Sequence, residues 1–162
     1  MPAAHANCIK PWCALRLRGT DLNAKTGNID DCKNYYQKAI ERALSFLKKD
    51  RQNKQANLLL AAMRVDYANF LVDVNSKVSH DLILRTSDHL EAWLQEYPQQ
   101  EEGWLYLAQS RTNEYPITVL SGDTQTAEII RDQVLKTIAG MSKDSRKKYA
   151  IEIDTLMKKL QF

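Results

Sequence analysis

Residues 79–111, SHDLILRTSDHLEAWLQEYPQQEEGWLYLAQSR, constrain the fold of this 162-residue chain more than any other stretch. In the first half, apolar residues recur at helical spacing, which predicts a helix with one apolar face. These residues are Ile83, Leu90, Trp93, Leu94 and Tyr97. Pro98 ends the helix near Tyr97, because the residue before a proline is pushed out of the α-helical region.

The second half of this stretch predicts another helix. Its acidic opening at Glu101 and Glu102 suits the positive end of a helix dipole. Trp104, Leu107 and Ala108 then fall on one face. The two halves together predict a helical hairpin with a short corner. We expect Trp104 to be mostly buried between this hairpin and the helix before it.

The corner of the hairpin resembles the junction between tetratricopeptide repeats. In that family a proline closes one unit and a Trp-x-x-Leu-Gly/Ala signature opens the next, as Pro98, Trp104, Leu107 and Ala108 do here. The match covers about one repeat, residues 86–111, and no second copy follows at the family's period of about 34 residues. The resemblance implies a helical array with a surface for binding other proteins, and it brings no catalytic residues.

Two residues depart from the repeat pattern. Trp93 stands where the family usually has a small residue, and Arg111 replaces the usual aromatic residue. The array is therefore expected to be tetratricopeptide-like in the middle and less regular elsewhere.

Length and composition predict a single all-α domain. Glycine and proline are few, at five and four, and the β-branched residues lie within helical patterns. Residues 1–29 lack a sustained helical stripe and predict an irregular arm, so residues 30–162 are expected to form one domain of antiparallel helical hairpins. About six helices are expected, over residues 30–49, 54–75, 79–97, 101–111, 123–140 and from 142 onward. Pro116 and Gly122 predict a long loop over residues 112–122.

The helix over residues 54–75 predicts a place for a partner to bind. It is apolar on two faces, which require two neighbours, and it leaves one narrow polar strip. Helical arrays bind ligands on the concave face that the first helix of each unit lines. On that face the polar strip would lie beside polar positions of the fourth helix. The candidate partner-binding residues are Asp66, Asn69, Asp73, Tyr106, Gln109 and Asn113. The alternative is that the strip is simply the solvated side of a buried helix.

The histidines and cysteines do not form a recognisable chemical motif. His80 and His89 neighbour aspartates in sequence, but adjacent residues on a helix point about 100° apart, and His5 lies in the arm. The three cysteines are Cys8, Cys13 and Cys32. With His5 they could be written as a zinc set, yet the second close pair of ligands is absent, so reduced packing cysteines or one disulfide are favoured. With no glycine-rich phosphate loop, we expect no enzyme, cofactor or metal.

These patterns favour a non-enzymatic adaptor or chaperone-like module that binds a protein segment in a helical groove. The alternative is a nucleic-acid-associated helical protein that uses basic clusters at residues 48–54 and 143–159, because the net charge of +3 is unevenly distributed. No run of residues is long and apolar enough to span a bilayer, and the first residues lack a secretory signal. A cytoplasmic location is expected on that ground, and a signal peptide removed earlier is the other interpretation.

Overall fold

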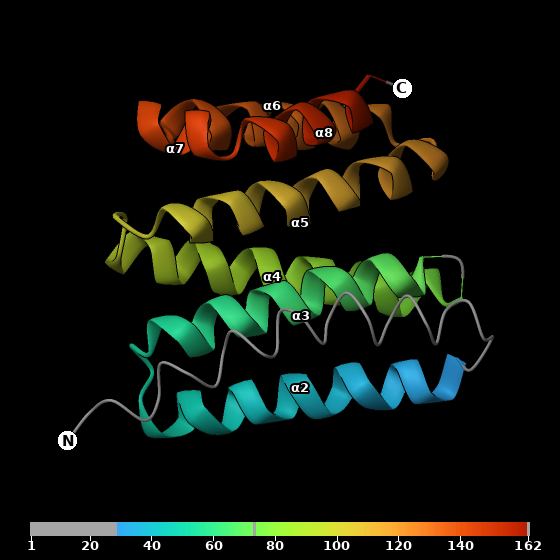
Figure 1. Ribbon diagram of the computed structural model, residues 1–162. Coiled ribbons are helices and arrows are strands. Elements are labelled where there is room, and N and C mark those ends of the chain that lie inside the picture. The colour runs from blue at the N-terminus through green and yellow to red at the C-terminus, as the bar shows by residue number, and fades with distance from the viewer. Residues whose placement is uncertain (1–28, 73, 162) are drawn as a thin grey trace.

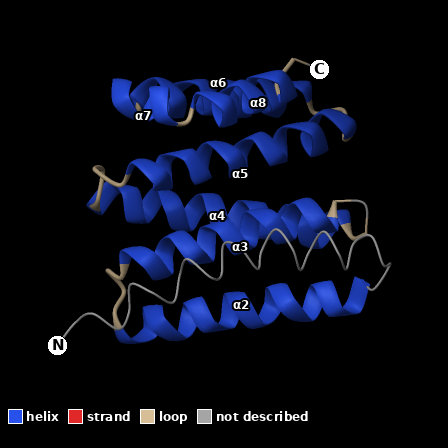
Figure 2. Ribbon diagram, viewed as in Figure 1, coloured by secondary structure: helices blue, strands red, loops and turns tan. Residues whose placement is uncertain are grey.

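The computed structural model describes residues 29–72 and 74–161, and these are entirely helical apart from the short connections (Figure 2). The helices are α2 (Ile29–Lys49), α3 (Lys54–Leu71), α4 (Ser76–Glu96), α5 (Glu101–Leu120), α6 (Thr124–Gly140), α7 (Lys143–Lys148) and α8 (Ala150–Lys159). The all-α class is confirmed, with seven helices over the described ranges instead of about six. Nearly all of the expected N-terminal arm lies outside these ranges. None of the described helices is long and apolar enough to cross a membrane.

From α2 to α6, each helix runs antiparallel to the one before it and packs beside it, so this part of the chain forms a stacked array of hairpins (Figure 1). In addition to its sequence neighbours, α3 contacts α5, and α5 contacts α8. These three helices therefore make one continuous row along one side of the array. The row matters because it carries the polar positions that the sequence singled out.

Short polar side chains fix where the helices begin. Asn53 accepts a hydrogen bond from the backbone of Ala56 at 2.9 Å, and Asn75 accepts one from Val78 at 3.2 Å. Because Asn75 caps α4, the helix before it ends at Leu71 and not near residue 75 as expected. Asp123 and Ser142 cap α6 and α7, as the sequence predicts.

The predicted loop over residues 112–122 was wrong, because α5 continues through Pro116 to Leu120. A proline inside a helix removes one backbone hydrogen bond and costs about 3 kcal/mol. Here Tyr115, next to Pro116, is buried in the cluster that joins α5 to α6 and α8, and burial of a large apolar side chain contributes about 1.5–3 kcal/mol against that cost. The chain turns only at Gly122, whose φ of +82° is a conformation that glycine adopts without strain.

The predicted last helix is two helices, α7 and α8, separated at Tyr149. Tyr149 leaves the helical region, with φ −107° and ψ 27°, although its N–H still bonds to the carbonyl of Ser145 at 2.9 Å. The break lets α8 lie along α5, where Leu156 and Leu160 are buried. The lysines of residues 143–159 are thereby divided between two helices.

Of the two tryptophans near the α4–α5 corner, Trp93 is the buried one. Trp93 is 6% exposed and packs with Leu94 and Leu107 between α3, α4 and α5. Trp104, expected to be mostly buried, is only half-buried, and its Nε1 donates to the carbonyl of Pro98 at 2.8 Å. The indole N–H stays at the corner to reach this carbonyl, which keeps the ring at the edge of the core.

Gly103, in the first turn of α5, provides the space for the Trp93 ring. A Cβ atom at residue 103 would lie 2.9 Å from Cζ3 of Trp93 and 2.9 Å from Cδ2 of Leu94. The large side chain of Trp93 on α4 is thus matched by the absence of a side chain at Gly103 on α5.

We therefore expect Gly103→Ala to lower the free energy of unfolding by about 1–3 kcal/mol through overpacking. In a helix with free space the same change stabilises by up to about 1 kcal/mol, so the sign is diagnostic. Gly140→Ala is the matched control, because a Cβ at residue 140 meets nothing within 4 Å. Urea denaturation of both variants tests the contact, and a Gly103→Ala variant as stable as the wild type would contradict it.

Candidate partner-binding groove

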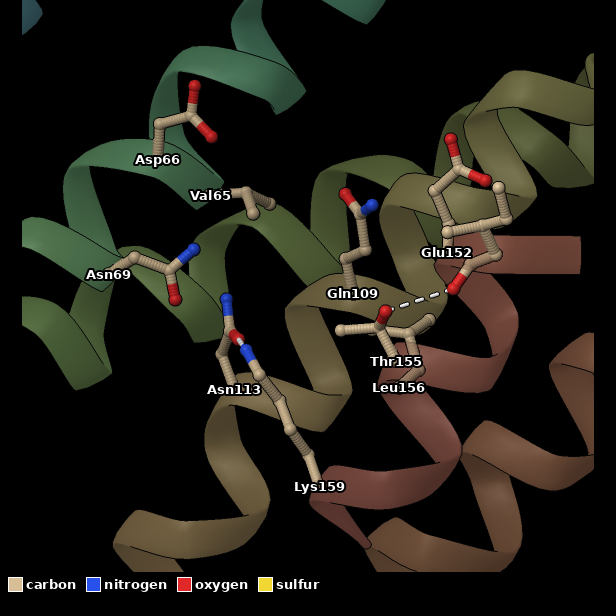
Figure 3. Close-up of a pocket in the computed structure, with 10 residues that line it drawn as sticks. Val65, Asp66, Asn69, Gln109, Asn113, Glu152, Thr155, Leu156 and Lys159 are labelled. Carbon is tan, nitrogen blue, oxygen red and sulfur yellow. Dashed lines mark hydrogen bonds between the residues drawn. The ribbon is translucent and has the colours of Figure 1, made fainter. Parts of the chain in front are cut away.

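Helices α3, α5 and α8 enclose a groove with a volume of about 280 Å³ (Figure 3). Each helix contributes residues spaced three or four apart, which share one helix face. The lining residues are Val65, Asp66 and Asn69 from α3, Gln109 and Asn113 from α5, and Ile151, Glu152, Thr155, Leu156 and Lys159 from α8. We call this the α3/α5/α8 groove.

Four of the six residues predicted to bind a partner line this groove. They are Asp66, Asn69, Gln109 and Asn113. Tyr106 does not line the groove, because it is half-buried and packs against two hydrophobic clusters of the core. Asp73 is outside the described residues. The structure thus brings together the α3 strip and the α5 positions, while partner binding by them remains a prediction.

The third wall of the groove, α8, was missed by the sequence analysis. Its lysines were assigned only to the basic cluster at residues 143–159, because nothing in a helical pattern reveals the break at Tyr149 or the docking of α8 on α5. Ile151 on this wall is 82% exposed at the rim of the groove, an exposure that only the structure reveals.

Asn113 is the buried polar residue of the groove. It is 6% exposed, its Oδ1 accepts a long hydrogen bond of 3.5 Å from Nζ of Lys159, and its Nδ2 has no partner among the described residues. Asn57 shows the contrast, since its buried Nδ2 donates to the carbonyls of Arg51 and Asn53 at 3.1 and 3.0 Å. A buried donor without an acceptor costs about 1–3 kcal/mol. Asn113 therefore holds an unsatisfied buried donor in the wall of the groove.

The charges of the groove are separated along its length. Asp66 and Glu152 lie on opposite walls at one end, and Lys159 reaches Asn113 at the other (Figure 3). Thr155 is engaged with its own helix, donating to the carbonyl of Ile151 at 2.9 Å. A bound molecule would consequently meet an acidic end and an end that presents donors.

A second set of polar contacts lies outside the groove and ties α4, α5 and α6 together. Arg111, with a side chain only 14% exposed, pairs with Glu91 and donates from Nη1 to Oγ1 of Thr137 at 2.7 Å. Glu114 approaches His80 at 3.8 Å. The pKa of Glu114 lies above its ordinary value because the carboxyl is buried, and His80 offsets only part of this rise. Arg111 thus links three helices, α4, α5 and α6.

The remaining chemical candidates are isolated. His89 is partly buried, and its burial, followed by the charge of Arg64, lowers its pKa. Cys32 is a buried free thiol whose pKa is raised by burial, while Cys8, Cys13 and His5 lie outside the described residues. Within residues 29–72 and 74–161, no group of three or more His, Cys, Asp or Glu side chains could hold a metal ion.

Residues 48–54, at the α2–α3 corner, and residues 143–148, in α7, lie at the same end of the array, whereas α8, which carries the remaining lysines of the cluster at residues 143–159, runs toward the opposite end (Figure 1). Glu101 stands between residues 48–54 and residues 143–148. Hydrogen bonds from Ser145 and Ser142, and the charges of lysines from both clusters, lower the pKa of Glu101. The basic surface is therefore interrupted by an ionised carboxylate.

Comparisons with protein-family models, curated proteins and solved structures give no match for this chain. The resemblance to tetratricopeptide repeats remains a prediction from the residues of the corner. Any function must be argued from the groove itself.

The unpaired Asn113 amide predicts an unusual stability effect. Asn113→Leu should raise the free energy of unfolding by about 1 kcal/mol, because a similar volume is kept and an unsatisfied buried donor is removed. Asn57→Leu is the matched control and should be destabilising, since it abolishes two short hydrogen bonds from an equally buried amide. Chemical denaturation of both variants measures the difference, and a loss of stability in Asn113→Leu would show that its amide is satisfied within the fold.

Proposed function

We propose that this protein is a non-enzymatic interaction module, of the adaptor or chaperone-like kind, that binds a segment of another protein in the α3/α5/α8 groove. The observation that carries the proposal is the buried, unpartnered Nδ2 of Asn113 in the wall of that groove. A fold retains such a donor at a cost of about 1–3 kcal/mol, and an incoming acceptor recovers that cost.

The composition of the groove also supports a peptide ligand. Asn69, Gln109 and Asn113 present side-chain amides, and each amide can donate to a main-chain carbonyl and accept from a main-chain N–H. Val65 and Leu156 add buried apolar surface beside them. All three walls belong to helices, so the groove is held in shape before binding and little ordering is required.

Nucleic-acid binding is the alternative that the sequence left open. In its favour, the basic cluster at residues 48–54 and the α7 part, residues 143–148, of the cluster at residues 143–159 share one end of the array (Figure 1). Against it, Glu101 interrupts them, and Lys158 is paired with Asp154 at 2.6 Å. A phosphate backbone following this end would meet that carboxylate between the two basic clusters, which opposes the electrostatic attraction on which such binding depends.

The proposal predicts that a double substitution in the groove abolishes partner capture. Asn69→Ala with Gln109→Ala removes two of the amides from positions that are not part of the core. Asn34→Ala with Gln125→Ala is the matched control, which removes the same two residue types from exposed positions on α2 and α6. Tagged proteins would be used for affinity purification from the source cells with quantitative mass spectrometry.

We expect the proteins captured by the wild type to be retained by the control and lost by the groove variant, with similar melting temperatures for all three. An unchanged set of captured proteins with a stably folded groove variant would place the binding surface elsewhere.

A further inference from the structure

We propose that Arg64 on α3, with Arg85 and His89 on α4, forms a binding site for a phosphate group. The ligand is a phosphate dianion, either free inorganic phosphate or the phosphate ester of a larger molecule. Arg64 and Asp66 are two residues apart, about 200° around α3, so the site lies on a different face of this helix from the α3/α5/α8 groove. The inference is therefore independent of peptide binding in that groove.

The packing of α3 against α4 brings the three side chains together. The two helices run antiparallel, and Oγ of Ser79 donates to the carbonyl of Ala68 at 2.8 Å, which fixes their register (Figure 1). In the same direction from this contact, Arg64 is about 6 Å along α3 and Arg85 is about 9 Å along α4. His89 follows Arg85 by four residues and shares its helix face. Because helical side chains lean toward the N-terminus of their own helix, Arg64 and His89 lean toward each other.

The positive groups of this cluster act on one another. Burial lowers the pKa of Arg64, and the charge of Arg85 lowers it further. Burial also lowers the pKa of His89, and the charge of Arg64 adds to that effect. Both shifts arise because removal from water and a nearby like charge disfavour the protonated form. The guanidinium groups nevertheless stay charged, so an anion placed among them would relieve their repulsion.

Arg64 lacks the counter-charge that a cation partly removed from water normally has. Within the described part of the chain, no carboxylate forms an ion pair with it. Asp81 pairs with Arg85 at 3.0 Å, but both side chains are more than half exposed, so water screens this pair. Asp88 precedes His89, yet adjacent residues on a helix point about 100° apart. Nε2 of His89 is itself buried without a hydrogen-bond partner among the described residues.

The donors of the cluster match a phosphate better than a carboxylate. A guanidinium is planar and donates two parallel hydrogen bonds to the oxygens of either group. One arginine is enough for the two oxygens of a carboxylate, whereas Arg64 and Arg85 come from different helices and can each engage separate oxygens of a phosphate. The two fixed positive charges also balance a dianion. The cluster therefore favours a phosphate group as its ligand.

Titration with inorganic phosphate at neutral pH and constant ionic strength tests the site. The imidazole C–H resonances of the three histidines would be followed by NMR and assigned with His5→Gln and His80→Gln variants. We expect the resonances of His89 to shift and to saturate, because an anion bound beside Arg64 favours the protonated imidazole. The resonances of His80, which approaches Glu114 of α5, should stay nearly constant.

Substitution of the arginines tests their part in binding. Arg64→Gln and Arg85→Gln should each weaken phosphate binding about tenfold, as expected for loss of one charge-assisted contact. Arg85 is exposed, so its variant keeps the test valid if Arg64→Gln folds poorly. Arg131→Gln is the matched control at an exposed position of α6 and should leave Kd unchanged.

A second ligand, the N-acetyl amide of phosphoserine, distinguishes the two sources of the phosphate group. Tighter binding of this ester than of inorganic phosphate would indicate a phosphorylated larger molecule, and the reverse would indicate the free anion. The groove variant Asn69→Ala, Gln109→Ala should bind both ligands like the wild type, because the two sites lie on different faces of α3.

Three results would overturn the site. A shift of His89 that rises without saturation, or an equal loss of affinity in Arg131→Gln, would show a general attraction of anions to a basic protein. Binding of acetate as tight as that of phosphate would show that the cluster recognises carboxylates. Loss of phosphate binding in the groove variant would place the ligand in the groove instead of beside Arg64.

Discussion

The close contact between Trp93 and Gly103 is the interaction on which the rest of the arrangement depends. It brings α4 and α5 together at their corner, with 2.9 Å from the Trp93 ring to the position that any Cβ of residue 103 would occupy. Because α5 also contacts α3 and α8, its position relative to α4 determines how far apart the walls of the groove stand. The placement of α5 therefore determines both the packing at the corner and the width of the α3/α5/α8 groove.

The periodicity of the sequence was enough to predict the helices but not their exceptions. Asn75 was predicted to end one helix, but it caps the next one. A cap residue differs from a residue inside a helix in its backbone conformation, and the spacing of apolar residues does not reveal that conformation. Pro116 looked like a loop signal, and the buried side chain of Tyr115 overrode it. In the first case a local capping interaction decided the helix boundary, and in the second tertiary burial outweighed a local preference of about 3 kcal/mol.

The candidate site was predictable in part for the same reason. Asp66 and Asn69 could be recognised because they were polar on a helix that is apolar elsewhere, and Gln109 and Asn113 because they share a helix face. The wall formed by α8 was not predictable, since it depends on the break at Tyr149 and on which neighbour α8 packs against. The spacing of residues in the sequence describes each helix separately, whereas the groove exists only where three helices pack together.

The placement of α8 also has a consequence for how the groove opens. Within the described part of the chain, α8 packs mainly on α5 and α7, whereas α3 and α5 are each held by several helices. Local opening needs least free energy where an element has the fewest buried contacts. One wall of the groove can thus detach while the other two remain folded, so a chain segment can enter from the side and need not be threaded from an end. The amide protons of α8 would then exchange with solvent before those of α3.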